Sequence, residues 1–193
     1  MPQIGTLCVY CGSSGAVADR YRSAATELGT ALANAGIELV YGGGHRGLMG
    51  LLADAAMAGG GRVTGIIPAS MREAEWAHEG VSELIVVDSM HTRKRLMAEK
   101  AEAYAVLPGG VGTLDETFEI LSWRQLRLHD KPIFLVDIDG YWQPLRRLLD
   151  HIGDTGFAGR IVPDLLQIVE DVPSLMTALS DTMPGHRARA DLL

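Results

Sequence analysis

The sequence YAVLPGGVGTLDETFEILSW, residues 104–123, contains the three parts of one structural unit. Its first residues, Tyr104–Leu107, are continuously apolar and predict a strand that is buried on both faces. A glycine-rich loop follows at Pro108–Gly112, and helical periodicity then extends from Thr113 to Leu128. A buried strand that leads through a short loop into an amphipathic helix is typical of a parallel sheet covered by helices.

The same unit recurs along the chain and predicts an α/β fold, a Rossmann-like doubly wound parallel sheet in a single domain. We expect this domain to span residues 1–183 and a frayed C-terminal tail to span residues 184–193. The expected strands are Thr6–Tyr10, Ile37–Tyr41, Val63–Ile67, Leu84–Val87, Tyr104–Leu107, Ile133–Val136 and an edge strand at Leu166–Val169. The expected helices are Asp19–Ala35, Gly47–Ala58, Thr92–Ala103, Thr113–Leu128, Trp142–Gly153 and Val172–Leu179.

The composition fits one globular domain and limits the class of partner. The chain has 193 residues, of which 47% are apolar and 21% charged, and its formal net charge is −7. Nucleic acid and anionic membranes are bound through clustered cations, so we expect neither as a partner. The sequence has no basic leader followed by a long apolar run, so the expected location is the cytoplasm. A small anionic ligand remains compatible with this charge, because a few local donors can hold it.

The two cysteines, Cys8 and Cys11, form a C-x-x-C sequence that could indicate a redox pair or half of a zinc site. Cys8 lies in an expected strand, where positions three apart point to opposite faces. The sequence has no second cysteine pair and no closely spaced histidine pair to complete a tetrahedral site. We therefore expect two buried thiols, no metal site and no cofactor.

Glycine-rich turns follow the first two expected strands. Cys11–Gly15 could contact a ligand or simply form a strand-to-helix turn, and the residues leave both interpretations open. Gly42–Gly47 matches the dinucleotide fingerprint G-x-G-x-x-G, but the next strand ends without the acidic residue that would hold the ribose. This argues against a redox dinucleotide. We expect Gly43 and its neighbours to bring the backbone close to a substrate or to a neighbouring helix.

The strongest candidate site is the loop after Tyr104–Leu107. Glycines without Cβ atoms let successive amide groups converge, and the start of a helix adds the positive end of its dipole. These features predict a phosphate cradle that lacks the lysine of a Walker loop. The residues expected to bind the phosphate are Gly109, Gly110, Val111, Gly112 and Thr113.

Glu116 has two interpretations. Together with Thr113 it could form a capping box, in which its carboxylate only accepts a hydrogen bond at the helix start. A carboxylate one turn beyond a phosphate cradle would also lie near the attached sugar, where positive charge develops during glycosidic cleavage. We favour this second role, because the helix dipole keeps a carboxylate ionised and a charge stabiliser, nucleophile or base needs that form.

Arg93, Lys94 and Arg95 form a basic cluster at the start of an expected helix, where cations oppose the helix dipole. An anion beside them would explain this placement, so we expect Arg93 to contact the ligand. Arg95 is expected to be a surface residue.

Three ordered motifs resemble the LONELY GUY family of cytokinin riboside 5′-monophosphate phosphoribohydrolases. They are Y-G-G-G-x-x-G-L-M-G at Tyr41–Gly50, M-H-x-R-K at Met90–Lys94 and P-G-G-x-G-T-x-x-E at Pro108–Glu116. The similarity covers most of the chain, from Leu7 to about Phe157. Ser122 stands where the family often has threonine, which keeps a hydroxyl group.

The resemblance implies a Rossmann-like homodimer that binds a purine nucleoside 5′-monophosphate without a cofactor. The implied reaction releases the free base and ribose 5-phosphate from AMP or an N6-modified AMP, as in cytokinin biosynthesis. It also implies that Arg93 and Glu116 are catalytic. The further substrate contacts that it implies are Gly110, Gly112 and Thr113 on the phosphate, with Lys94, Glu75 and Ser122 nearby. Apolar residues within Phe118–Leu128 could face the partner or the core.

Other functions predict different observations. A nucleotide or cofactor carrier could use a similar P-G-G-x-G-T loop without chemistry, but it would not need Glu116 together with Arg93. An oxidoreductase that uses Gly42–Gly47 would bind NAD tightly. Proteins of this kind have also carried the label of lysine decarboxylase, a reaction that normally needs a pyridoxal Schiff base or another electron sink, and no residue set in the sequence indicates one.

Overall fold

Strands and helices alternate along the chain, and the structure, a computed structural model, describes residues 4–72, 77–162 and 164–183. The strands are β1 (Thr6–Tyr10), β2 (Glu38–Tyr41), β3 (Val63–Pro68), β4 (Glu83–Val87), β5 (Ala103–Val106), β6 (Ile133–Val136) and β7 (Gln167–Val169). The helices are α1 (Asp19–Ala35), α2 (Gly47–Ala58), α3 (Ala69–Arg72), α4 (Met90–Lys100), α5 (Val111–Gln125), the 3₁₀ helix η1 (Ile138–Gly140), α6 (Gln143–Asp154) and α7 (Val172–Asp181).

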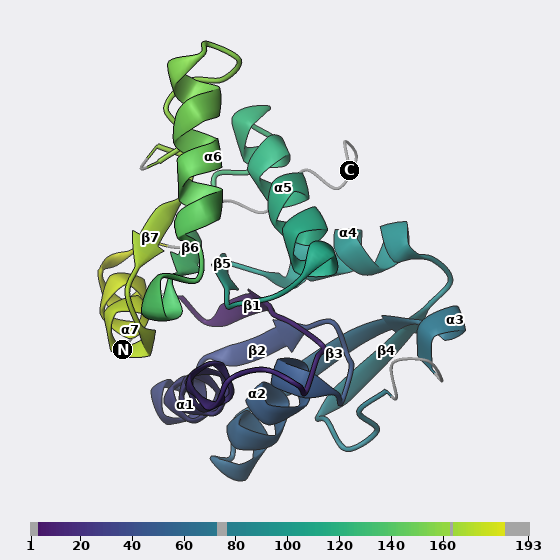
Figure 1. Ribbon diagram of the computed structural model, residues 1–193. Helices are drawn as coiled ribbons and strands as arrows, with labels where there is room; N and C mark the ends of the chain where they lie inside the picture. The colour runs from purple at the N-terminus through teal and green to yellow at the C-terminus, as the bar shows by residue number, and fades with distance from the viewer. Residues whose placement is uncertain (1–3, 73–76, 163, 184–193) are drawn as a thin grey trace.

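The strands form one sheet of seven in the order β4-β3-β2-β1-β5-β6-β7, and all neighbouring strands are parallel (Figure 1). The chain starts in the middle of the sheet, builds outward to β4 and then crosses back to β5. This confirms the predicted Rossmann-like, doubly wound α/β class. The tail expected at 184–193 lies outside the described residues. The direction of winding changes between β1 and β5, and in such sheets ligands bind at the carboxyl ends of the strands beside this change.

Two layers of helices cover the sheet (Figure 1). Leu7 and Val9 of β1 belong to the core shared with α1, α2 and α7, whereas Cys8 and Tyr10 belong to the core shared with α4, α5 and α6. This alternation explains why the central strands β5 and β6 are continuously apolar runs, because both of their faces are buried.

The two cysteine side chains lie in opposite cores, as their spacing in a strand predicts. Cys8 packs on the α5 side and Cys11 on the α2 side, and both are buried free thiols. Burial raises the pKa of each thiol well above its ordinary value. High pKa values keep the thiolate form scarce, so both residues behave as small apolar core residues.

Two helix starts that position the site lie two residues earlier than the sequence pattern predicts. In α4, the Ser89 hydroxyl accepts a hydrogen bond from the Thr92 amide at 3.1 Å, so Ser89 is the N-cap and the helix begins at Met90. In α5, Gly110 is the N-cap with extended backbone angles and no side-chain cap, and the helix begins at Val111. None of the described helices is long and apolar enough to cross a membrane.

Candidate active site

A cavity of about 200 Å³ lies at the carboxyl ends of the central strands, where the sheet changes its direction of winding. It is mainly polar and collects residues from segments that are far apart in the sequence. Its lining residues are Cys11, Gly12, Ser13, Met49, Arg93, Gly110, Val111, Gly112, Thr113 and Glu116. The cavity therefore brings together the two residues expected to be catalytic and most of the expected phosphate loop.

The start of α5 provides a cluster of amide groups on one side of this cavity. The first amides of a helix have no acceptor within the helix, and here they belong to the residues that follow the Gly110 cap. A Cβ atom added to Gly110 or Gly112 would meet no other atom within 4 Å, so open space adjoins both positions. Amides and a helix dipole beside open space are the elements of an anion site.

Close packing fixes the shape of the glycine loop. The Thr113 side chain folds back over Gly109, where an added Cβ atom would lie 2.0 Å from Thr113 Oγ1. On the other side, the Gly12 amide donates to the Pro108 carbonyl at 3.1 Å, which ties the turn after β1 to the loop. The Tyr141 hydroxyl donates to the Gly109 carbonyl at 2.7 Å. Contacts from three directions therefore hold the loop in one conformation.

The capping-box interpretation of Glu116 is wrong. Thr113 is the third residue of α5 instead of its N-cap, so it cannot pair with Glu116 in that motif. The Glu116 carboxylate instead lies 3.1 Å from the Arg93 guanidinium, and its side chain is only 11% exposed. Glu116 also lines the cavity beside the α5 amides. The structure therefore places this carboxylate beside the predicted anion site.

Arg93 is buried and is held from several sides. Its Nε donates to the Ile66 carbonyl at 3.1 Å, and its Nη2 donates to the Gly42 carbonyl at 3.2 Å. Its Nη1 lies 3.1 Å from Glu116 Oε1 and 3.4 Å from the sulfur of Met90. Backbone carbonyls at the ends of β2 and β3 therefore aim the guanidinium at the carboxylate. The sequence predicted an anion beside Arg93 near the start of α4. The Glu116 carboxylate is at least part of that negative charge.

The glycines after β2 serve to hold Arg93 and to pack the backbone. A Cβ atom on Gly42 would lie 1.9 Å from Arg93 Nη2, so only glycine leaves room for the guanidinium. Gly43 has a φ of 78° and packs against Ile66 and Ile67 of β3. Gly47 has a φ of 62° and packs against the backbone of Ser13. Gly43 is not among the residues that line the cavity, and its expected contact with substrate stays a prediction.

Lys94 connects α4 and α5, the two helices that carry Arg93 and Glu116. Its ammonium group lies 2.7 Å from Asp115 Oδ2 and 3.4 Å from Glu119 Oε2, so it joins α4 to α5. Burial alone would lower the pKa of Lys94, but the hydrogen bonds and charges of Asp115 and Glu119 outweigh burial and raise it. Lys94 therefore stays protonated. It does not line the cavity, so its substrate contact remains a prediction.

The remaining expected contacts are Ser122 and Glu75. Ser122 is exposed on α5, beyond Glu116, and does not line the cavity. Glu75 lies outside the described residues.

Tyr21 and Tyr141 line a neighbouring cavity, although the sequence analysis did not single out either residue. A second, mainly apolar cavity of about 300 Å³ shares Gly12, Ser13 and Gly110 with the first and is also lined by Tyr21 and Tyr141. Met49 of α2 contributes to the first cavity. Tyr141 could have been noticed because it follows β6, whose end lies near the same edge of the sheet.

Sequence comparison relates this chain to known proteins. A family model described as "possible lysine decarboxylase" matches residues 49–179. Cytokinin riboside 5′-monophosphate phosphoribohydrolase LOG1 of Arabidopsis thaliana is 43% identical over 183 residues, which cover 93% of this chain and 84% of that protein. The probable phosphoribohydrolase LOGL9 of Oryza sativa subsp. japonica is 43% identical over 178 residues, with coverage of 92% and 78%.

Solved structures share the fold at much lower sequence identity. The molybdenum cofactor carrier protein of Chlamydomonas reinhardtii superposes with a TM-score of 0.70 and 22% identity, over 91% of this chain and 96% of that one. The molybdenum cofactor binding protein of Rippkaea orientalis gives 0.69 and 20%, over 91% and 95%. These similarities concern the fold alone. The sequence matches decide the family, and the chain belongs to the LONELY GUY family of cytokinin riboside 5′-monophosphate phosphoribohydrolases.

Proposed function

We propose that this protein hydrolyses the N-glycosidic bond of AMP or an N6-modified AMP, releasing the free base and ribose 5-phosphate. One observation carries the proposal: the Glu116 carboxylate, held by Arg93, lines the same cavity as the first amides of α5. A 5′-phosphate bound to those amides leaves the ribose to extend toward the carboxylate. Relatives that are named phosphoribohydrolases and are about 40% identical support the same reaction.

The phosphate loop contributes to catalysis by positioning. We infer that the backbone of Gly109–Thr113 holds the phosphate through amide hydrogen bonds and the helix dipole. Contacts from Thr113, Gly12 and Tyr141 hold the loop, so phosphate binding requires little further ordering of its backbone. A preorganised loop places the anomeric carbon close to Glu116.

Glu116 acts where charge develops. When the bond between C1′ and the base nitrogen breaks, its electron pair leaves with the base and C1′ becomes cationic. The Glu116 carboxylate either stabilises this cation or takes the proton from the water that attacks C1′. The new C1′–O bond gives ribose 5-phosphate, and the base leaves with one proton.

Arg93 keeps this carboxylate in place. Its guanidinium is anchored to the Ile66 and Gly42 carbonyls, which restricts the rotation of the group that contacts Glu116. Arg93 also lines the cavity, where we propose that it contacts ribose or phosphate oxygens of the substrate. Gly43, Lys94, Ser122 and Glu75 remain proposed substrate contacts on the basis of sequence.

Substitution of Glu116 by Gln tests the proposal. The amide has the size of the carboxylate but lacks its charge, so we expect adenine release from AMP, followed by chromatography, to fall at least about 100-fold. Glu99→Gln is the matched control because Glu99 pairs with Arg95 away from the cavity, and it should keep wild-type turnover. Turnover within twofold of wild type in Glu116→Gln would refute the assignment.

The same assay separates an enzyme from a carrier. A protein that only binds the nucleotide would leave AMP unchanged, although AMP would raise its melting temperature. Wild-type protein is expected both to release adenine and to be stabilised by the products. Comparing AMP with isopentenyladenosine monophosphate, GMP and CMP would then identify the preferred base.

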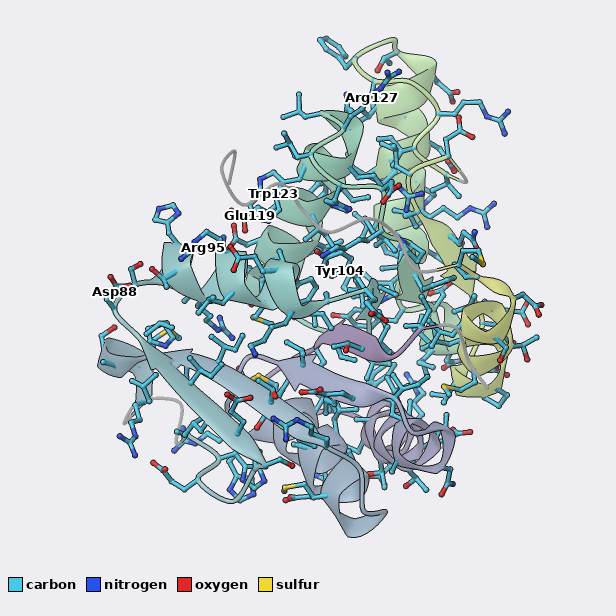
Figure 2. The ribbon with its side chains drawn as sticks, turned by 180° about the vertical axis from the view of Figure 1, so that it is seen from behind. Asp88, Arg95, Tyr104, Glu119, Trp123 and Arg127 are labelled. Carbon is cyan, nitrogen blue, oxygen red and sulfur yellow. The ribbon has the colours of Figure 1, made fainter. Side chains whose placement is uncertain are left out.

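We further propose that the protein is a cytoplasmic homodimer. Support comes from the family and from exposed apolar side chains, with Phe118 of α5 at 38% and Leu126, which follows the last residue of α5, at 66%. Figure 2 shows Glu119 and Trp123 following one another along α5, with Arg95 of α4 beside them. A partner covering α5 would bury this surface. Gel filtration with light scattering should give twice the chain mass of 20.7 kDa, and a mass equal to one chain would reject the dimer.

A further inference from the structure

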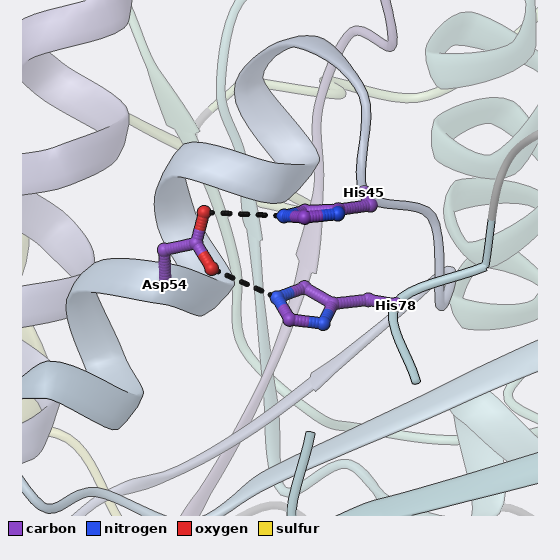
Figure 3. A group of neighbouring side chains, drawn as sticks. All are labelled: His45, Asp54 and His78. Atoms are coloured by element: carbon purple, nitrogen blue, oxygen red, sulfur yellow. Dashed lines mark hydrogen bonds and ion pairs between the residues drawn. The ribbon is translucent and has the colours of Figure 1, made fainter. Parts of the chain in front are cut away.

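His45, Asp54 and His78 form a cluster outside the cavity, built from three separate segments (Figure 3). His45 follows β2, Asp54 lies in α2 and His78 precedes β4. His78 Nε2 is 2.9 Å from Asp54 Oδ1, and His45 Nε2 is 3.4 Å from Asp54 Oδ2. All three potential ligand atoms lie within 4.8 Å of one another. Each imidazole ring therefore points its Nε2 atom toward the Asp54 carboxylate.

Backbone contacts hold the segments that carry the two histidines. Gly44 and Ala77 form an antiparallel bridge, and the His78 amide donates to the Gly43 carbonyl at 3.0 Å. The centroids of the two rings lie 4.0 Å apart, and the ring planes are tilted by 35°. The His78 side chain is only 7% exposed, whereas His45 and Asp54 are 50% and 54% exposed. The cluster is thus fixed on its inner side and open to solvent on its outer side.

The donor set suits a metal ion of intermediate softness. Two imidazole nitrogens and one carboxylate oxygen are ligands that zinc accepts. A tetrahedral zinc site with bonds of about 2.0–2.1 Å has ligand atoms about 3.4 Å apart. The two histidine nitrogens lie 2.9 and 3.4 Å from different oxygens of Asp54, and one ligand atom from each residue lies within 4.8 Å of the others, so small side-chain movements bring the three to that spacing. The exposed outer side leaves the fourth position for water.

We propose that His45, Asp54 and His78 bind one zinc ion or a similar divalent transition-metal ion. The ion would join the loop after β2 to α2 and to the segment before β4. Gly42, in the same loop as His45, supplies a carbonyl to Arg93, so the bound ion stabilises a segment that supports the active site. The three ligands do not line the cavity, and the proposal is independent of the reaction assigned above.

Metal binding at His78 Nε2 requires the proton of the neutral ring to lie on its other nitrogen. The Gly80 amide lies 3.3 Å from His78 Nδ1, so in the metal-free protein that nitrogen accepts and Nε2 carries the proton toward Asp54. With a metal ion on Nε2 the neutral ring carries its proton on Nδ1, so coordination replaces both the contact with Asp54 and the hydrogen bond from the Gly80 amide.

Zinc titration against a chromophoric chelator tests the site, using protein without a histidine tag. Wild-type protein should bind one ion per chain. His45→Ala should weaken binding at least about 100-fold, because loss of a ligand exceeds the effect of losing an outer-shell partner. His151→Ala is the matched control, since His151 is exposed on α6, and it should bind as wild type does.

Thermal unfolding provides a second readout that does not depend on enzyme activity. Zinc should raise the melting temperature of wild type and His151→Ala, and it should leave that of His45→Ala unchanged. His45 is half exposed, so this variant is expected to fold, and circular dichroism checks that it does. Absence of stoichiometric binding in wild type, or equal affinity in folded His45→Ala, would overturn the proposal.

Discussion

Arg93 Nη1 lies 3.1 Å from Glu116 Oε1, and this buried ion pair joins α4 to α5 beside the cavity. The two residues come from opposite sides of the point where the sheet changes its direction of winding, since α4 precedes β5 and α5 follows it. A buried ion pair is often close to neutral for stability, because removing both charges from water opposes their attraction. We expect the Arg93–Glu116 ion pair to contribute mainly by fixing the orientation of the Glu116 carboxylate.

Arg93→Lys should separate charge from geometry. Lysine keeps the positive charge but cannot contact Ile66, Gly42 and Glu116 with one planar group. We expect kcat for AMP to fall at least about 100-fold, or about 2.7 kcal/mol in the barrier, with a smaller change in KM. Arg95→Lys, a change on the surface, should leave both constants unaltered. Wild-type kcat in Arg93→Lys would show that the fixed guanidinium is dispensable.

Gly42→Ala should mainly lower kcat, whereas Gly112→Ala should mainly weaken the binding of AMP. The new Cβ at position 42 would lie 1.9 Å from Arg93 Nη2, so the guanidinium must shift and kcat should fall as it does in Arg93→Lys. At position 112 the new Cβ meets no protein atom within 4 Å, but it stands beside the cavity. That variant should fold normally and bind AMP more weakly. Steady-state kinetics of both proteins would check the contrast, and equal effects on kcat and KM would contradict it.

Tyr141→Phe tests the support of the phosphate loop. The variant loses the 2.7 Å hydrogen bond to the Gly109 carbonyl and should be less stable by about 1 kcal/mol. A looser loop should raise KM for AMP and the inhibition constant of inorganic phosphate by similar factors, with kcat within twofold of wild type. Tyr21→Phe, in the same apolar cavity, is the control and should change neither. A loss confined to kcat would assign Tyr141 a different role.

His129 should make stability depend on pH. Its Nε2 lies 2.9 Å from the Ile120 carbonyl and its Nδ1 accepts from the Lys131 amide, so the neutral ring is satisfied. Burial lowers the pKa of His129 from 6.5 to about 4. Between pH 6.5 and about 4, His129 is protonated in the unfolded chain but neutral in the folded protein. The contribution of the neutral ring to the free energy of unfolding is therefore complete above pH 6.5 and is lost as the pH falls toward 4.

Urea unfolding at a series of pH values measures this effect. The expected loss is on the order of 3 kcal/mol between pH 7 and pH 4, taking 1.36 kcal/mol for each pKa unit. His129→Gln cannot acquire this charge and should show a smaller slope over the same range. Identical slopes for the variant and wild type would place the pH dependence in other groups.

The sequence was informative about the sheet because its strands are buried on both faces and therefore stand out as apolar runs, from Thr6–Tyr10 to Ile133–Val136. The edge strand β7 and the helix α7 were predicted as well. The short α3 and η1 were not, because neither is long enough to show periodicity. The starts of α4 and α5 were set by Ser89 and by the uncapped Gly110, local features that the hydrophobic pattern does not contain.

The candidate site was predictable where one continuous segment makes it. The loop before Glu116 is such a segment, and its glycines and carboxylate could be interpreted together. The partnership of Gly42 with Arg93 could not, since the two residues are distant in sequence and meet only because β2 and β3 lie beside α4. The cluster of His45 and His78 could not be predicted for the same reason, because the two residues are distant in sequence and meet only in the folded protein.

The central place of β1 in the sheet has a consequence for synthesis of the chain. β1 pairs with β2 soon after it leaves the ribosome, but its other neighbour, β5, is made much later, when Ala103 can align with Leu7. Until then a nascent chain presents an apolar strand with an unpaired edge, which is a template for aggregation. Truncated products that end before β5 should therefore depend on chaperones, even though they contain four of the seven strands.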